Sequence, residues 1–161
     1  MDNLVKGFEP VYDKNSRVLI LGSFPSVKSR QVNFYYGNPR NRFWDILKEY
    51  FCENIPQTPQ ERAQFLLDKN IALWDVVTEC EIDGSKDSSI KNFKVANIER
   101  LLQNSKICLI ILNGSKSYEI FQSRFGDIEV PYVRLPSTSP ANVSFKKEPW
   151  LNELSRVFGR T

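Results

Sequence analysis

The fold is decided by Arg17-Val18-Leu19-Ile20-Leu21-Gly22, which Ser23-Phe24-Pro25-Ser26 follow directly. A short apolar run that ends at a glycine is typical of a strand buried on both faces of a sheet. Three further runs of this kind predict strands at 71–77, 107–112 and 130–135. Pro131 in the last run suits an edge strand, because proline has no N–H to donate to a neighbouring strand.

Helical patterns lie between these runs. Apolar residues recur at helical spacing, and Thr58-Pro59-Gln60-Glu61 has the composition of a helix start. Strands that alternate with helices indicate a parallel sheet covered on both faces. We therefore expect a single domain over 1–161 with an α/β fold: a three-layer α/β/α sandwich around a central, mostly parallel four-stranded sheet. The helices are expected at 41–52, 58–69, 96–104, 115–125 and 146–158.

The composition excludes several classes of site. The chain has no histidine, so mechanisms and metal sites that need imidazole are excluded. Cys52, Cys80 and Cys108 are scattered and form neither a disulfide framework nor a metal-ligand cluster. We expect no metal and no cofactor. No apolar run reaches the roughly 18 residues that span a bilayer, and residues 1–6 do not resemble a signal peptide. The expected location is the cytoplasm, at the nucleoid when bound to DNA, with no membrane contact.

The charge is unevenly distributed although the net charge is only +3. The segments 14–44, 88–98 and 130–147 hold half of the 22 Lys and Arg residues and no acid. Such segments fit the footprint of a polyanion, but uneven surface charge without any partner remains an alternative.

The unusual composition falls where this fold class places its sites. In open parallel sheets the site lies at the carboxyl ends of the strands, here at 22–26, 78–87, 113–115 and 136–140. The segment 34–44 (Phe-Tyr-Tyr-Gly-Asn-Pro-Arg-Asn-Arg-Phe-Trp) combines aromatic, Arg and Asn residues without an acid. This composition suits a site that stacks a flat ring, reads its polar edge and tolerates phosphate.

Two polar loops complete the candidate site. Residues 135–142 (Leu-Pro-Ser-Thr-Ser-Pro-Ala-Asn) could grip phosphates with hydroxyls and push a small apolar group into a duplex. The alternative is an ordinary Ser/Pro-rich connection. Residues 83–92 form a hydroxyl-rich loop that could touch phosphate. We interpret Asp75 as a strand-end cap and Glu79 as a surface charge.

With these segments in order, the chain resembles the uracil-DNA glycosylase superfamily, and within it the hypoxanthine-DNA glycosylase branch. The similarity covers nearly the whole chain, through 22–26, 34–44, 72–76, 84–92, 113–114 and 135–142. Two polar groups common in the superfamily are absent, because Phe24 stands where many members have Asp or Asn, and Leu135 where many have His. In the hypoxanthine branch catalysis is attributed to an Asn that corresponds to Asn41. Branches with an iron–sulfur cluster need four cysteine ligands, which the three scattered cysteines of this chain cannot supply.

The resemblance implies a monofunctional enzyme that flips a deaminated base, hypoxanthine preferred, out of DNA and hydrolyses its glycosidic bond. Its partner is DNA containing that base, and the protein is expected to be a monomer. Lys91 is taken as the only lysine within the core motifs, so a Schiff-base step is not expected. Asn41 is the catalytic candidate, with a helix cap as the alternative role. The predicted base contacts are Tyr36 (core packing being its alternative), Phe24, Gly22, Ser23 and Asn113, and the predicted DNA contacts are Ser26, Ser89, Ser137, Thr138, Ser139, Pro140, Asn142 and Lys146.

Two other functions stay open. A uracil-directed or broad deaminated-base glycosylase would use the same residues in a pocket of different size. A damaged-DNA-binding or nucleotide-binding module without catalysis would explain the missing Asp and His.

Overall fold

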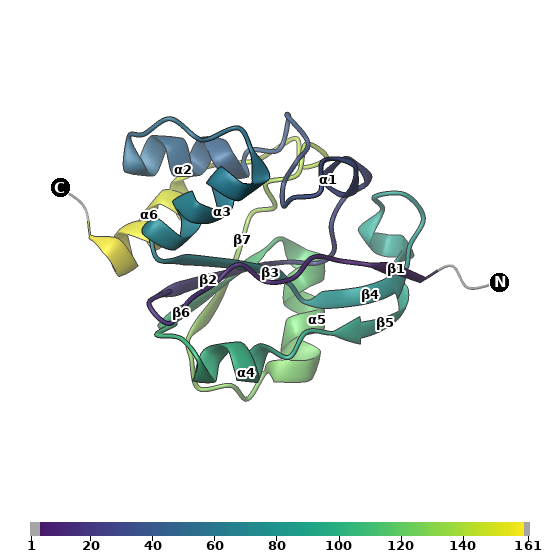
Figure 1. The fold of residues 1–161 in the computed structure, drawn as a ribbon. Coiled ribbons are helices and arrows are strands. Elements are labelled where there is room, and N and C mark those ends of the chain that lie inside the picture. The colour runs from purple at the N-terminus through teal and green to yellow at the C-terminus, as the bar shows by residue number, and fades with distance from the viewer. Residues whose placement is uncertain (1–3, 160–161) are drawn as a thin grey trace.

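The computed structural model describes residues 4–159; residues 1–3 and 160–161 of the expected domain lie outside them. Four parallel strands form its central sheet in the order β3-β2-β6-β7 (Figure 1). The predicted α/β fold with a four-stranded parallel sheet is confirmed. The strands are β2 (Val18–Gly22), β3 (Ile71–Asp75), β6 (Leu109–Asn113) and β7 (Tyr132–Leu135).

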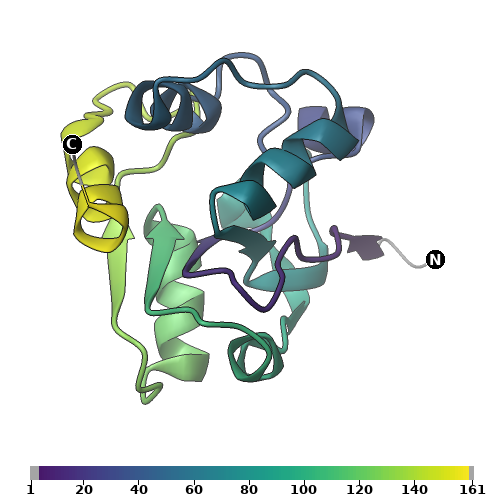
Figure 2. The same cartoon turned by 60° about the vertical axis from the view of Figure 1, so that its left-hand side comes forward.

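Helices cover both faces of this sheet, as expected. The helices α2 (Phe43–Phe51), α3 (Pro59–Asp68) and α6 (Glu148–Phe158) lie on one side of the sheet in Figure 1, and α4 (Ile98–Gln103) and α5 (Ser115–Phe125) on the other. Figure 2 shows α6, in yellow, beside the end of β7. Along residues 4–159 no helix has the length and apolar character to cross a membrane.

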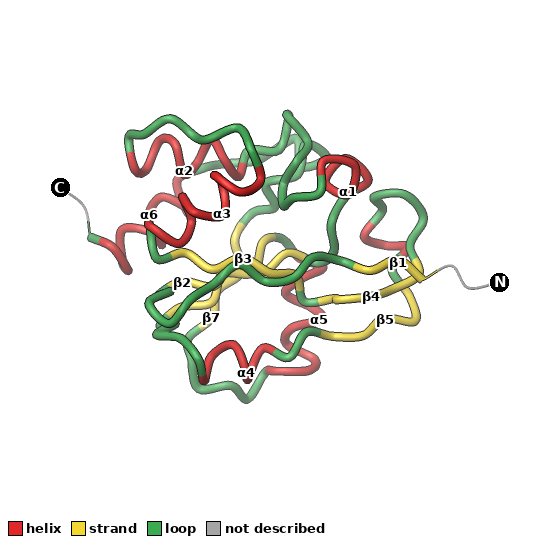
Figure 3. Tube along the Cα trace, viewed as in Figure 1, coloured by secondary structure: helices red, strands yellow, loops and turns green. Residues whose placement is uncertain are grey.

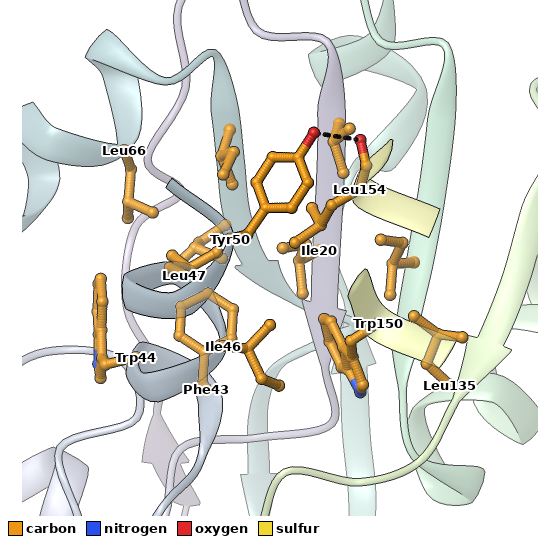
Figure 4. Close-up of a cluster of buried hydrophobic side chains, with 14 of the residues drawn as sticks. Ile20, Phe43, Trp44, Ile46, Leu47, Tyr50, Leu66, Leu135, Trp150 and Leu154 are labelled. Carbon is orange, nitrogen blue, oxygen red and sulfur yellow. Dashed lines mark hydrogen bonds between the residues drawn. The ribbon is translucent and has the colours of Figure 1, made fainter. Parts of the chain in front are cut away.

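The alternating side chains of β2 divide the core in two. Val18 and Ile20 face the cluster under α2, α3 and α6, whereas Leu19 and Leu21 face the cluster under α4 and α5. All four are fully buried, which explains the unbroken apolar run in the sequence. Figure 4 shows the first cluster, where Phe43 of α2 meets Trp150 of α6 edge to face with ring centres 6.4 Å apart.

A second, antiparallel sheet was not predicted. It contains β1 (Leu4–Lys6), β4 (Val77–Glu81) and β5 (Lys91–Val95) in the order β1-β4-β5 (Figure 3). The expected strand at 71–77 is therefore wrong at its end, because the chain leaves the parallel sheet at Val76 and continues as β4. The N–H groups of Val76 and Val77 donate to the carbonyls of Gly22 and Ser23 at 2.8 and 3.1 Å, which ties this crossing to the end of β2.

Two short helices at the same end of the sheet were also not predicted. Helix α1 (Val27–Val32) begins where the Ser26 hydroxyl accepts from the Ser29 N–H at 3.1 Å. The 3₁₀ helix η1 (Asp87–Ser89) lies in the loop between β4 and β5. Both flank the turn that follows β2, so they help to shape the candidate site.

Candidate active site

A cleft of about 650 Å³ opens at the carboxyl ends of the parallel strands. Its walls come from the turn after β2, the segment before α2, the end of β3, the loop holding η1 and the loop after β7. Most of the predicted site residues line it, namely Gly22, Ser23, Phe24, Ser26, Tyr36, Asn41, Asn113, Ser137, Thr138, Ser139 and Pro140. The topology thus brings together segments that are far apart in the sequence.

Three predicted DNA contacts do not line the cleft. The hydroxyl of Ser89 accepts from the Asp83 N–H at 2.8 Å and donates to the Lys86 carbonyl at 2.6 Å, which stabilises its own loop. The Asn142 amide donates to the Ser137 carbonyl at 3.0 Å. Lys146 is exposed in a separate groove. Their contact with DNA stays a prediction.

Asn41 lies one residue before the N-cap of α2, which is Arg42, and it lines the cleft. Its Oδ1 accepts from the Phe43 N–H at 2.9 Å, so it bonds to the first turn of α2, but the expected alternative role as the helix N-cap is wrong by one residue. Within the described residues its Nδ2 group forms no hydrogen bond, although Asn41 lines the cleft. The side chain therefore presents two free N–H donors while its carbonyl oxygen is in use.

Tyr36 is held in an unusual position. Its φ of 53° lies in the left-handed region, and its ring stacks on Phe43 with centres 4.2 Å apart and planes inclined by 26°. One face of the ring is thus covered by the core. Its hydroxyl is buried and has no hydrogen-bond partner of ordinary geometry among residues 4–159. Burial raises the pKa of Tyr36, the charge of Asp75 raises it further and the neighbouring Asn113 amide lowers it.

Asn113 and Thr138 form a reciprocal pair. The Asn113 Nδ2 donates to Thr138 Oγ1 at 3.0 Å, and its Oδ1 accepts from the Thr138 N–H at 3.0 Å. The pair joins the end of β6 to the loop after β7. One amide hydrogen and one lone pair of Asn113 remain for the predicted contact with a base edge.

Arg42 also holds this loop. Its N–H donates to the Thr138 carbonyl at 3.0 Å, and its guanidinium donates to the carbonyls of Ser139 and Asn142 at 3.1 and 2.8 Å. At the base of the loop the Trp150 indole donates to the Pro136 carbonyl at 2.8 Å. The loop is therefore fixed by bonds to its backbone, and sequence analysis did not identify Arg42 in this role.

The loop 83–89 is fastened to the turn after β2. The Ser23 hydroxyl donates to Asp87 at 2.6 Å, and Arg30 of α1 donates to the Gly84 carbonyl at 2.6 Å. Burial raises the pKa of Asp87, while the bond from Ser23 and the charge of Lys116 lower it. Lys86 of this loop lies within the motif 84–92 and lines the cleft, so the prediction that Lys91 is the only motif lysine is wrong.

Asp75 lines the cleft as well, and its interpretation as a strand-end cap is wrong. Neither carboxyl oxygen forms a hydrogen bond with a described residue, and Oδ2 is fully enclosed. Burial, and secondly the charge of Asp87, raises the pKa of Asp75 to about 8. The only sequence signal was an acid at the carboxyl end of an apolar strand, at the edge where the site was expected.

Known proteins match this chain over nearly its whole length. Residues 9–156 match the family model of the uracil DNA glycosylase superfamily. The hypoxanthine DNA glycosylase of Methanosarcina acetivorans is 36% identical over 144 residues, covering 88% of this chain and 90% of the relative. That of Methanosarcina barkeri is 35% identical over 116 residues, covering 71% and 73%.

A solved structure agrees with these matches. The solution NMR structure of a candidate uracil DNA glycosylase from Methanosarcina acetivorans has a TM-score of 0.82, 32% identity, and coverage of 95% of this chain and 97% of its own. The predicted resemblance to the superfamily, and to its hypoxanthine-directed branch, is confirmed. The chain therefore belongs to the uracil DNA glycosylase superfamily, and it is a DNA glycosylase.

Proposed function

We propose that this protein excises hypoxanthine from DNA by hydrolysis and leaves an abasic site, acting as a monofunctional enzyme and a monomer. The observation that carries the proposal is the free Nδ2 group of Asn41 in a 650 Å³ cleft at the carboxyl edge of the sheet. The names of the two curated relatives support hypoxanthine as the substrate. The base must leave the helical stack to enter such a cleft, at a cost of a few kcal/mol.

Asn41 could either hold the departing base or orient the attacking water, and its hydrogen bonding favours the first role. Because its Oδ1 already accepts from the Phe43 N–H, the side chain offers donors rather than an acceptor. Donors suit the departing purine, whose ring nitrogens and O6 gain negative charge as the glycosidic bond breaks. We therefore assign Asn41 to the leaving base rather than to the positioning of water.

The two loops beside the cleft supply the DNA contacts in this proposal. Residues 137–140 line one side of the cleft, and the hydroxyls of Ser137 and Ser139 accept from backbone N–H groups of their own loop. Directly beyond this loop, Val143 is 92% exposed. An exposed apolar side chain at this place suits a wedge between bases, because such wedges stabilise a duplex from which a base has been extruded.

A strand-cleavage assay tests the proposal. End-labelled duplexes that carry one hypoxanthine, uracil or xanthine are incubated with the protein and then treated with alkali. We expect a product band for hypoxanthine that appears only after alkali, and no protein–DNA adduct on borohydride reduction. Nicking without alkali together with such an adduct would contradict monofunctional hydrolysis, and Lys86→Ala would then identify the amine. A stronger band for uracil would favour the uracil-directed alternative.

Two substitutions of Asn41 separate its donors from its bond to the first turn of α2. Asn41→Ala removes both the donors and the oxygen that accepts from the Phe43 N–H, whereas Asn41→Asp keeps an accepting oxygen and loses the donors. We expect both to lower the single-turnover rate roughly a hundredfold or more while DNA binding persists, and only Asn41→Ala to lower thermal stability. Full activity of Asn41→Asp would show instead that the residue positions water.

A further inference from the structure

Asp75 lies in the wall of the cleft, and no step described above uses it. The residue is 5% exposed, and its Oδ2 has no hydrogen-bond partner among the described residues. No Lys or Arg of the described chain forms an ion pair with it. Buried polar groups are rarely left unsatisfied, because the loss of hydration is costly. An unpartnered carboxyl at the wall of a cleft therefore points to a ligand group.

Gly22 lets this carboxyl pack directly against β2. β2 and β3 pair in a register that puts Gly22 next to Asp75. A Cβ atom at Gly22 would lie 2.6 Å from Asp75 Oδ1 and 3.2 Å from the Tyr36 hydroxyl. The carboxyl and the phenol, both incompletely bonded, thus both pack against Gly22, and any larger residue at this position would displace them.

The groups around Asp75 keep it from ionising. Burial is the main cause of its pKa of about 8, and the nearby Asp87 carboxylate of η1 adds to it. The other groups that face it are the hydroxyls of Tyr35 and Tyr36, whose own pKa values are raised. Lys116 of α5 acts on Asp87. At neutral pH the Asp75 side chain is thus mainly a carboxylic acid, with one O–H donor beside a carbonyl acceptor.

We propose that Asp75 is a specificity-determining residue which, as a neutral acid beside the Tyr36 hydroxyl, reads the lactam edge of the flipped base. This inference rests on the proposed function. Deamination of adenine replaces an amino group beside a ring nitrogen acceptor with a carbonyl beside a ring N–H. Through Oδ1, the carboxyl oxygen that is not enclosed, the acid O–H can donate to that carbonyl. A carboxylate could only accept, and it would repel the carbonyl oxygen.

The protonation of Asp75 can be tested by an isosteric variant that does not titrate. Asp75→Asn keeps a donor beside an acceptor, so it should retain excision near neutral pH at a reduced rate. Single-turnover excision of hypoxanthine is measured for both proteins between about pH 6 and about pH 9.5. The wild-type rate, divided by that of Asp75→Asn, should fall about thirtyfold across this range as the acid ionises. A ratio independent of pH overturns the inference, and so does a folded Asp75→Asn protein without activity at any pH.

Asp75→Leu supplies the matched control without hydrogen bonds. It should lose hypoxanthine excision at every pH while it still binds a duplex with a stable abasic-site analogue. Retained excision by a folded Asp75→Leu protein overturns the inference, and if this variant does not fold, the Asp75→Asn ratio still decides. The wild-type protein at about pH 6 tests the proposed function separately, because its activity there depends on neither variant.

Discussion

Two side chains of the cleft differ in how well the sequence could predict them. Asn41 belongs to a recognisable motif, which placed it in the site, and its position before an apolar helix predicted a bond to the first turn of that helix, although Arg42 is the N-cap. The role of Asp75 could not be predicted correctly from the sequence, because its environment depends on Gly22 of the neighbouring strand and on Asp87 of a distant loop. Only the folded chain shows that this acid is enclosed and has no partner.

At the same scale, Asp75 should make stability depend on pH. Its folded-state pKa of about 8 exceeds the ordinary value of 3.8, so the fold favours the protonated form. This contribution is complete below the unfolded pKa and is lost as the pH rises towards 8. Asp75→Asn should therefore increase the free energy of unfolding by a few kcal/mol at about pH 9 and change it little at about pH 4. Urea unfolding at both pH values checks this, and equal gains at the two would contradict it.

At the scale of elements, the strands of the parallel sheet could be predicted and those of the second sheet could not. A strand buried on both faces has an unbroken apolar run, as Val18 to Leu21 do. β4 and β5 are only partly covered and alternate with polar residues, so their runs resemble loops in the sequence. The apolar residues Val76 and Val77 continue the run of β3, which concealed the point where the chain changes sheets.

The contact between β6 and the loop after β7 yields a prediction at this scale. Thr138→Val keeps the shape of a side chain that is 1% exposed but removes the acceptor of the Asn113 Nδ2 group. The lost bond should lower the free energy of unfolding by about 1–3 kcal/mol and weaken binding to damaged DNA. Urea unfolding and binding titrations check both effects. Thr138→Ser retains the hydroxyl, so a loss of binding as large as that of Thr138→Val would show that the methyl group matters instead.

At the scale of the whole molecule, the segments rich in Lys and Arg are not simply a free basic surface. Arg42 is used to hold the loop after β7, while Lys94 and Lys147 pair with Glu79 and Glu49 at 3.4 and 2.7 Å. The sequence predicted where basic residues gather, but not which of them form hydrogen bonds or ion pairs within the protein. The interaction with DNA therefore depends on the shape of the cleft and its loops as well as on charge.

Val143 tests how the whole molecule meets a duplex. If this exposed side chain fills the gap left by an extruded base, Val143→Ser should lower excision from double-stranded DNA roughly tenfold and leave excision from single strands nearly unchanged. Parallel single-turnover assays on the two substrates measure the difference. Val32→Ser, which alters another exposed valine, on α1, is the control and should affect neither substrate. Equal losses on both substrates would rule out a wedge.

The three tryptophans of the chain have a common arrangement with a practical consequence. Each indole N–H donates to a backbone carbonyl in a loop: Trp44 to Tyr35, Trp74 to Phe8 and Trp150 to Pro136, at 3.3, 3.1 and 2.8 Å. Tyr35 lines the cleft, and Pro136 begins the loop that forms one of its walls. Because indole fluorescence responds to its hydrogen bond, this protein carries built-in optical reporters on both sides of its cleft. Its movements on DNA can be followed in real time without a label.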